Sequence, residues 1–287
     1  MPEAESRAAG RRLAGLIRLV HPFPSLLNGA ATSALALLAG GDLPTAGRLG
    51  LAMVALQMSI GALNDVIDAP ADAGRKPRKP IPMGVLSVAA GRAVTGITGG
   101  VGLLLAVPSG PIVLVIAAAG LATGYGYDLR AKGTAWSWLP FAIGIPLLPV
   151  FAWVGATGRL PPAMALLLPA AIAAGTALAI ANARADLERD GSAGLASIAT
   201  RLGLDRGWVV QVALLIPVIV LAVGSLSIGQ GPQVALAGTL IAAAVIVAGL
   251  ALGRRATPGM RQRSWEIQAV GVAGLAAAWL AGLAGPR

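Results

Sequence analysis

Long apolar segments alternate with short polar ones along nearly the whole chain. A transmembrane helix needs about 20 apolar residues, and nine segments approach that length. They span residues 24–40, 49–65, 86–107, 110–127, 135–155, 162–182, 208–228, 233–252 and 267–284. The pattern predicts an all-α integral membrane protein, in which residues 21–287 form a single domain, a bundle of nine transmembrane helices.

Residues 1–20 differ from these segments because four arginines are interleaved with leucine, isoleucine and valine. On a helix this spacing separates a basic face from an apolar one, which is typical of a helix lying in the membrane interface. Arg18 interrupts the apolar run that a signal peptide would need. We therefore expect an N-terminal interfacial helix, followed by the first span after His21.

The lysines and arginines predict the orientation of the spans. Of the 22 basic residues, 19 fall in the first tail and in the longer connections at 66–85, 128–134, 183–207 and 253–266, with the adjoining helix ends. The other three are Arg48, Arg159 and Arg287. By the positive-inside rule, the N-terminus is cytoplasmic and the C-terminus external.

Composition supports the membrane class and excludes several others. Hydrophobic residues make up 56% of the chain and charged residues only 12%, about half of what a soluble domain carries. The absence of cysteine excludes a thiolate nucleophile and a zinc site built on sulfur. The net charge of +10 comes from short basic segments rather than one continuous stripe, so we expect no nucleic-acid partner.

Polar residues are concentrated where the second apolar segment ends. Asn64, Asp68 and Asp72 follow one another at intervals of four, which places them on one face of a helix. Pro70 lies between the last two and would usually kink the helix, so Asp72 is the least secure member of the face.

The same spacing returns later, at the end of the sixth apolar segment. Asn182, Asp186 and Asp190 repeat the interval of four, and we expect them to share a helix face as well. Both sets fall on the predicted cytoplasmic side. Two copies of one spacing at equivalent helix ends are difficult to explain as solvated loop residues.

Converging carboxylates predict a cation. In a site with little water they repel one another unless a cation lies between them, and oxygen ligands of this type suit Mg²⁺, whose shell is often completed by substrate phosphates. Basic residues near both sets could bind the anionic oxygens. They are Arg75, Lys76, Arg78 and Lys79 near the first set, and Arg130, Lys132, Arg184 and Arg189 near the other connections. The sequence thus predicts a Mg²⁺-dependent diphosphate site, and the membrane location predicts a lipid on the diphosphate.

At this point the residues resemble a family. Asn64-Asp65-x-x-Asp68-x-x-x-Asp72, with Arg78-Lys79-Pro80 behind it, resembles the first aspartate-rich motif of the UbiA superfamily of intramembrane prenyltransferases. Asp186-x-x-x-Asp190, followed by residues 199–203 (Ala-Thr-Arg-Leu-Gly), is similar to the second. The resemblance implies Mg²⁺-dependent transfer of an isoprenyl group from an isoprenyl diphosphate to a small, usually aromatic acceptor, as in quinone or chlorin biosynthesis.

The resemblance also implies roles for individual positions. The metal–diphosphate assembly would be coordinated by Asn64, Asp68, Asp72, Asp186 and Asp190. Asp68, Asp186 and Lys132 would be catalytic, and Asn64, Arg78, Lys79 and Tyr127 would bind substrate. From spacing and charge we add Asn182 and Arg184 to the substrate-binding set. Lys79 departs from the family, which commonly has arginine there, and so keeps the charge but loses the planar fork.

Several alternatives stay open at this level. His21 is the only histidine, and together with Asn28 or Asp128 it could orient or deprotonate a phenol, although an interfacial structural role is favoured.

A terpene cyclase of the same family would ionise its substrate in the same way. A cation-coupled transporter is a remote alternative, because transport sites usually lie near the bilayer midplane. The sequence does not specify the isoprenoid length, the acceptor or the oligomeric state.

Overall fold

In the computed structural model, which describes residues 2–74, 79–229 and 232–284, the chain is helical apart from short connections. The elements are α1 (Pro2–Leu19), α2 (Pro22–Leu38), α3 (Leu43–Asp72), α4 (Val88–Ala106), the 3₁₀ turn η1 (Val107–Ser109), α5 (Pro111–Gly126), the π-helical turn η2 (Tyr127–Ala131), α6 (Leu139–Thr157), α7 (Met164–Ala185), α8 (Leu187–Ser192), α9 (Ile198–Ile228), α10 (Gln233–Gly253) and α11 (Pro258–Ala284).

The all-helical membrane fold predicted from the sequence is confirmed. Each predicted apolar segment corresponds to one of the helices α2 to α7 and α9 to α11. In the described part of the chain, eight helices are long and apolar enough to cross a membrane. Helix α2 has only 17 residues and is not among them. The predicted count of nine spans is therefore not confirmed.

Several helices extend beyond their apolar segments. Helix α3 has 30 residues; it begins after Asp42, whose carboxylate accepts a hydrogen bond from the Thr45 amide at 2.9 Å, and it continues through Pro70 to Asp72. Helix α9 begins after Ser197 and is kinked at Gly203, whose φ of 73° suits glycine. Because α3 runs to Asp72, it carries its whole acidic motif.

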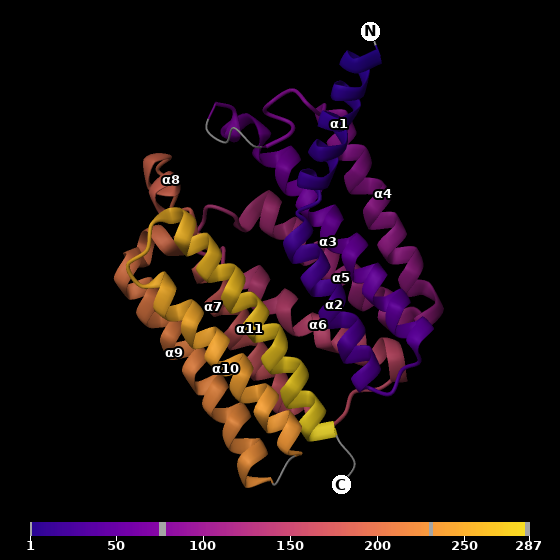
Figure 1. The fold of residues 1–287 in the computed structure, drawn as a ribbon, viewed down its shortest axis with the longest axis vertical. Coiled ribbons are helices and arrows are strands. Elements are labelled where there is room, and N and C mark those ends of the chain that lie inside the picture. Colours follow the sequence, from indigo (N-terminus) through magenta and orange to yellow (C-terminus); the bar gives the residue numbers. More distant parts are fainter. Residues whose placement is uncertain (1, 75–78, 230–231, 285–287) are drawn as a thin grey trace.

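The helices form a ring around a central space. Contacts run from α2 to α3, α4, α5, α6 and α7 in turn, and α11 closes the ring by packing against both α7 and α2. Helices α9 and α10 cover the outside of α7 and α11 (Figure 1). The first and second acidic motifs lie on α3 and at the end of α7, so they belong to different sides of this ring.

Both motifs lie at the same end of the bundle. In Figure 1, α1 and α8 are both at the top, whereas α11 ends at the bottom. The C-terminal ends of α3 and α7 point to this same end. The fold thus brings together two acidic segments that are more than a hundred residues apart in the sequence.

Small residues allow α2 and α3 to approach closely. A Cβ atom at Gly50 would lie 1.9 Å from Ser33 Oγ and 2.9 Å from the Gly29 carbonyl oxygen, and one at Gly29 would lie 2.2 Å from a methyl of Val54. Membrane helices lack a hydrophobic driving force between them, so close packing of this kind contributes much of their association.

We predict that Gly50→Ala destabilises the bundle by about 1–3 kcal/mol, the usual effect of overpacking, because the added methyl group would collide with α2. Gly47→Ala on the same helix is the matched control, since nothing lies within 4 Å of the position that its added methyl group would take. Thermal unfolding of the detergent-purified protein measures both. Equal stability of the two variants would contradict close α2–α3 packing.

Candidate functional site

A cavity of about 720 Å³ occupies the centre of the ring. Its wall is made by residues of α2, α3, α5, α6, α7 and α11, together with the charged connections at one end. The charged residues of the lining gather at that end. They are Arg18, Lys79, Asp128, Lys132, Asp186, Arg189 and Glu266. The rest of the lining is mainly apolar, so the cavity has one charged mouth and a long apolar body.

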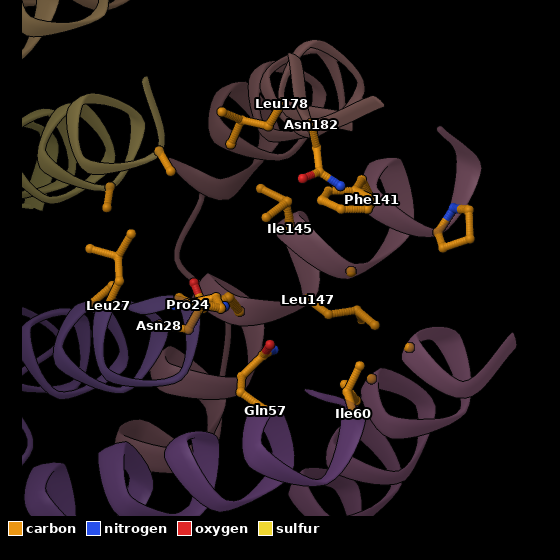
Figure 2. A pocket seen from close by; sticks show the side chains of 18 of the residues that line it. Pro24, Leu27, Asn28, Gln57, Ile60, Phe141, Ile145, Leu147, Leu178 and Asn182 are labelled. Atoms are coloured by element: carbon orange, nitrogen blue, oxygen red, sulfur yellow. The ribbon is translucent and has the colours of Figure 1, made fainter. Parts of the chain in front are cut away.

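Figure 2 shows how the middle of the cavity is built. Asn28 and Gln57 point into the space from α2 and α3, and Asn182 enters from α7 beside Phe141. Aliphatic side chains such as Leu147 fill the wall between these amides. The cavity can therefore hold an apolar chain while offering a few neutral hydrogen-bonding groups.

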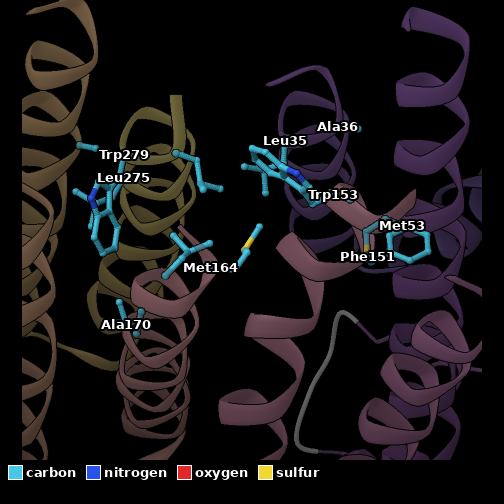
Figure 3. Packing of buried hydrophobic residues seen from close by; sticks show 14 of the residues in the cluster. Leu35, Ala36, Met53, Phe151, Trp153, Met164, Ala170, Leu275 and Trp279 are labelled. Carbon is cyan, nitrogen blue, oxygen red and sulfur yellow. The ribbon is translucent and has the colours of Figure 1, made fainter. Parts of the chain in front are cut away.

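The deep end of the cavity is closed by the hydrophobic core. Leu35, Met53, Phe151 and Trp279 belong both to the cavity lining and to the buried cluster in Figure 3. Gln262 near the mouth and Trp279 both lie on α11, and at about 1.5 Å per residue they are roughly 25 Å apart along its axis. The apolar body is thus long enough for an extended lipid tail.

At the mouth, Lys79 lies among the acidic residues of α3. Its Nζ atom is 2.6 Å from Asp65 Oδ1, 3.4 Å from Asp68 Oδ2 and 3.2 Å from Asp72 Oδ2. Lys79 Nζ also donates to the side-chain oxygen Oδ1 of Asn64 at 3.5 Å. Asn64, Asp68 and Asp72 therefore share a face despite Pro70, because α3 continues to its final residue.

The pKa of Lys79 reflects this surrounding charge. Burial by itself lowers the pKa, but Asp65, followed by Asp68 and Asp72, outweighs burial and raises it above its ordinary value. The side chain is only 15% exposed. Lys79 therefore stays charged at neutral pH and balances the carboxylates around it.

A second ammonium approaches the same motif from η2. Lys132 Nζ donates to Asp68 Oδ2 at 2.5 Å, and Asn64 Nδ2 donates to Asp128 Oδ1 at 2.7 Å. The π-helical turn at 127–131, closed by the Lys132 amide on the Tyr127 carbonyl at 2.8 Å, brings both residues toward α3. Predicted site residues from two parts of the chain thus meet at one point.

Tyr127 joins this group to the other side of the ring. Its ring packs edge-on against Phe141 with centroids 5.5 Å apart, and Asn182 of α7 lies beside Phe141 (Figure 2). All three residues line the cavity. The cavity wall thus continues from η2 to the last turn of α7.

His21 also belongs to the mouth. Its Nε2 atom is 2.9 Å from Asp65 Oδ1, and its ring packs against Gly61. His21 has a left-handed backbone with φ of 48° just before α2, a strained conformation for this residue type. The turn directs the imidazole toward α3 and into the cavity lining.

The second motif has a different geometry from the predicted one. Helix α7 ends at Ala185, and Asp186 (φ −102°, ψ 4°) separates it from α8. The prediction that Asn182, Asp186 and Asp190 lie on one continuous helix face is therefore wrong. Asn182 and Asp186 still line the cavity, Asp186 is paired with Arg189, and Asp190 lies on the short α8.

The predicted substrate-binding role of Arg184 is also wrong. Its side chain is 2% exposed, does not line the cavity, and donates from Nη2 to the Gly253 carbonyl at 3.0 Å. The reason is helical geometry: at about 100° per residue, Arg184 is turned to the side opposite Asn182. Arg189, one turn further, is the arginine of this segment that lines the cavity.

Two acidic residues of the site were not among the predicted metal, catalytic or substrate-binding residues, although Asp128 was considered as a partner of His21. Asp65 is 1% exposed and contacts both His21 and Lys79, and Asp128 is buried against Asn64. The interval 65–68–72 follows helical periodicity and could have revealed Asp65. The position of Asp128 depends on the π-helical turn, for which we find no sequence signal. Arg78, another predicted ligand, lies outside the described residues.

A comparison with protein-family models gives the family. The model described as the UbiA prenyltransferase family matches residues 26–282. The chain belongs to this family. The match covers all the helices that form the ring, from within α2 to near the end of α11. A comparison with curated protein sequences finds no match.

Solved structures of UbiA homologues share the fold. The apo homologue from Aeropyrum pernix K1 has a TM-score of 0.74 and 18% identity, covering 88% of this chain and 96% of that one. The homologue from Archaeoglobus fulgidus bound to DMAPP and Mg²⁺ has a TM-score of 0.69 and 18% identity, covering 92% of this chain and 98% of that one. A structure described for digeranylgeranylglyceryl phosphate synthase has a TM-score of 0.69 and 15% identity, covering 96% of this chain and 98% of that one.

The donor set of this UbiA-family site suits a hard cation that keeps some of its waters. Within the described ranges, no three acidic or histidine side chains lie close enough to hold a metal ion by themselves. The carboxylates are instead divided between α3 and the α7–α8 junction. Oxygen ligands that need completion by water and phosphate are typical of Mg²⁺.

We predict that Lys79→Gln destabilises the metal-free protein by about 3–5 kcal/mol, because it removes the cation of a largely buried ion-pair cluster. Since the pKa of Lys79 is raised above its ordinary value in the folded protein, this contribution is fully present below the ordinary pKa and is lost only as pH rises through the folded-state pKa. The loss of stability caused by Lys79→Gln should therefore be the same at pH 7 and pH 9.

Thermal unfolding at both pH values measures this effect. Arg92→Gln is the control, because Arg92 is exposed on α4. If Lys79→Gln were as stable as the control, Lys79 would not balance the carboxylates.

Proposed function

We propose that this chain transfers an isoprenyl group from an isoprenyl diphosphate to a small acceptor inside the membrane. The observation that carries the proposal is the cavity itself, which extends roughly 25 Å along α11 and has ammonium groups and divided carboxylates at its mouth and an apolar body behind them. An isoprenyl diphosphate has the same two parts, an anionic head and an apolar tail.

The family relationship supports this reading. The Archaeoglobus homologue is described in complexes with DMAPP and Mg²⁺ and with GPP and Mg²⁺. By analogy, Mg²⁺ would be held here between Asn64, Asp68 and Asp72 on α3 and Asp186 and Asp190 on the other side. When bound, Mg²⁺ neutralises negative charge that develops on the leaving diphosphate.

The basic residues of the mouth would bind the diphosphate. Lys79 and Lys132 are now paired with carboxylates, and Arg189 is paired with Asp186. An incoming diphosphate would take over these cations as hydrogen-bond acceptor, and its growing charge would strengthen the contacts as the carbon–oxygen bond breaks. Lys132 and the two aspartates Asp68 and Asp186 therefore keep their proposed catalytic roles.

The apolar body would protect the allylic cation. Its wall excludes water, which would otherwise capture the cation, and ring faces such as those of Tyr127 and Phe141 stabilise positive charge. We propose an aromatic acceptor that enters beside His21 and Asp128, where an imidazole and a carboxylate can orient or deprotonate a phenol. The amides of Asn28 and Gln57 offer further neutral contacts.

The proposed orientation places this mouth on the cytoplasmic side. The basic connections, α1 and both acidic motifs lie at one end of the bundle, and the excess of lysine and arginine in these segments favours the cytoplasmic face. The N-terminus would then be cytoplasmic, with α1 in the interface, and the C-terminus external. Charges confined to one end of the cavity disfavour a transporter, whose site usually lies near the midplane.

We predict that Asp68→Asn and Asp186→Asn each abolish Mg²⁺-dependent release of diphosphate, because each removes a carboxylate from one half of the divided site. Asp42→Asn is the control: Asp42 lies at the opposite end of α3, and asparagine also caps helices well. Release is measured with purified protein and a panel of isoprenyl diphosphates. Unchanged release from both site variants would refute the metal assignment.

Product analysis separates the transferase from a cyclase on the same scaffold. With phenolic and naphthoate acceptors present, we expect a prenylated acceptor by mass spectrometry, and little diphosphate release without them. A cyclic hydrocarbon or alcohol formed without any acceptor would instead identify a cyclase.

A further inference from the structure

The junction between α7 and α8 must be held in place by something other than a continuous helix. Asp186 interrupts the helical backbone, so the direction of α8 relative to α7 is not fixed by helix geometry alone. Helix α8 has only six residues. The second half of the proposed metal site therefore depends on contacts from its surroundings.

Arg261 supplies these contacts from outside the cavity. It lies in the first turn of α11, is 3% exposed, and is not part of the cavity lining. Its Nε atom donates to the Arg184 carbonyl at 2.6 Å, its Nη1 atom donates to the Ala256 carbonyl at 2.7 Å, and its Nη2 atom donates to the Glu188 carboxylate. One planar group thus joins α7, α8 and the connection before α11.

Each of these contacts has a physical reason. The carbonyl of Arg184 is among the last four of α7, which have no partner within the helix, and a cation at a helix C-terminus is favourable. Glu188 belongs to α8, between Asp186 and Asp190, but does not line the cavity. Its pairing with Arg261 joins this side of α8 to the first turn of α11.

We propose that Arg261 is a positioning residue for the second acidic half of the site: by joining the end of α7 to Glu188, it orients the Asp186–Asp190 segment toward the cavity. The inference rests on the proposed function for the identity of the bound ligand. Partners that orient metal ligands without touching the metal commonly change metal affinity by about 10- to 100-fold when they are removed.

The test measures ligand binding separately from catalysis. The detergent-purified full chain is titrated with MgCl₂ at a fixed concentration of inorganic pyrophosphate, and binding is followed as the rise in unfolding temperature. For Arg261→Gln we expect the Mg²⁺ concentration at half-effect to rise by about 10- to 100-fold. Arg261→Lys should not restore the wild-type value, because one ammonium cannot span the three segments.

Two further variants keep the test decisive. Arg263→Gln is the matched control, since Arg263 is exposed on the same helix, and it should titrate like the wild type. Glu188→Gln removes only the charge of the α8 contact and leaves the Arg184 carbonyl paired, so it should shift the Mg²⁺ requirement in the same direction by a smaller factor. If Arg261→Gln does not fold, the Glu188 variant decides the question.

Unchanged Mg²⁺ binding in the variants would contradict the positioning role of Arg261. Wild-type Mg²⁺ titrations of both Arg261→Gln and Glu188→Gln, even with a lower unfolding temperature, would show that Arg261 has only a structural role and would overturn the proposal. A wild-type Mg²⁺ titration of Glu188→Gln alone would do so if Arg261→Gln cannot be purified. If the wild-type protein itself gains no stability from Mg²⁺ and pyrophosphate, the proposed function fails instead.

Discussion

The cluster of acidic residues around Lys79 is the interaction on which the site depends. Carboxylates at the end of a membrane helix repel one another strongly unless cations compensate them. Here the ammonium of Lys79 touches Asp65, Asp68 and Asp72, and that of Lys132 touches Asp68 again. This balance lets α3 continue to Asp72 and brings the segments after α3 and α5 together at the cavity mouth.

The two halves of the site are built in different ways. On α3, one helix carries the acidic motif, and the compensating lysines come from the segments after α3 and η2. On the other side, Asp186 follows the end of α7 and lines the cavity, and the buried Arg184 and Arg261 contact the backbone around this junction.

The sequence predicted features that follow from periodicity and failed where tertiary contacts decide. Apolar segments near the length of a bilayer crossing predicted the helices, and the interval of four predicted that Asn64, Asp68 and Asp72 share a face. The same interval wrongly predicted one continuous helix face for Asn182, Asp186 and Asp190, because the spacing of polar residues does not show where a helix is interrupted. Arg184 was misplaced because its charge was considered without its helical angle, although the about 100° advance per residue separates it from Asn182.

The measurement that tests the account most directly is an experimental structure of the protein with Mg²⁺ and an isoprenyl diphosphate analogue that cannot ionise. The account predicts a diphosphate between Asp68 on α3 and Asp186 at the α7–α8 junction, with metal contacts to both halves, Lys79 and Lys132 turned toward the diphosphate, and the tail directed toward Trp279. A diphosphate bound outside this mouth, or a metal held by one half alone, would contradict it.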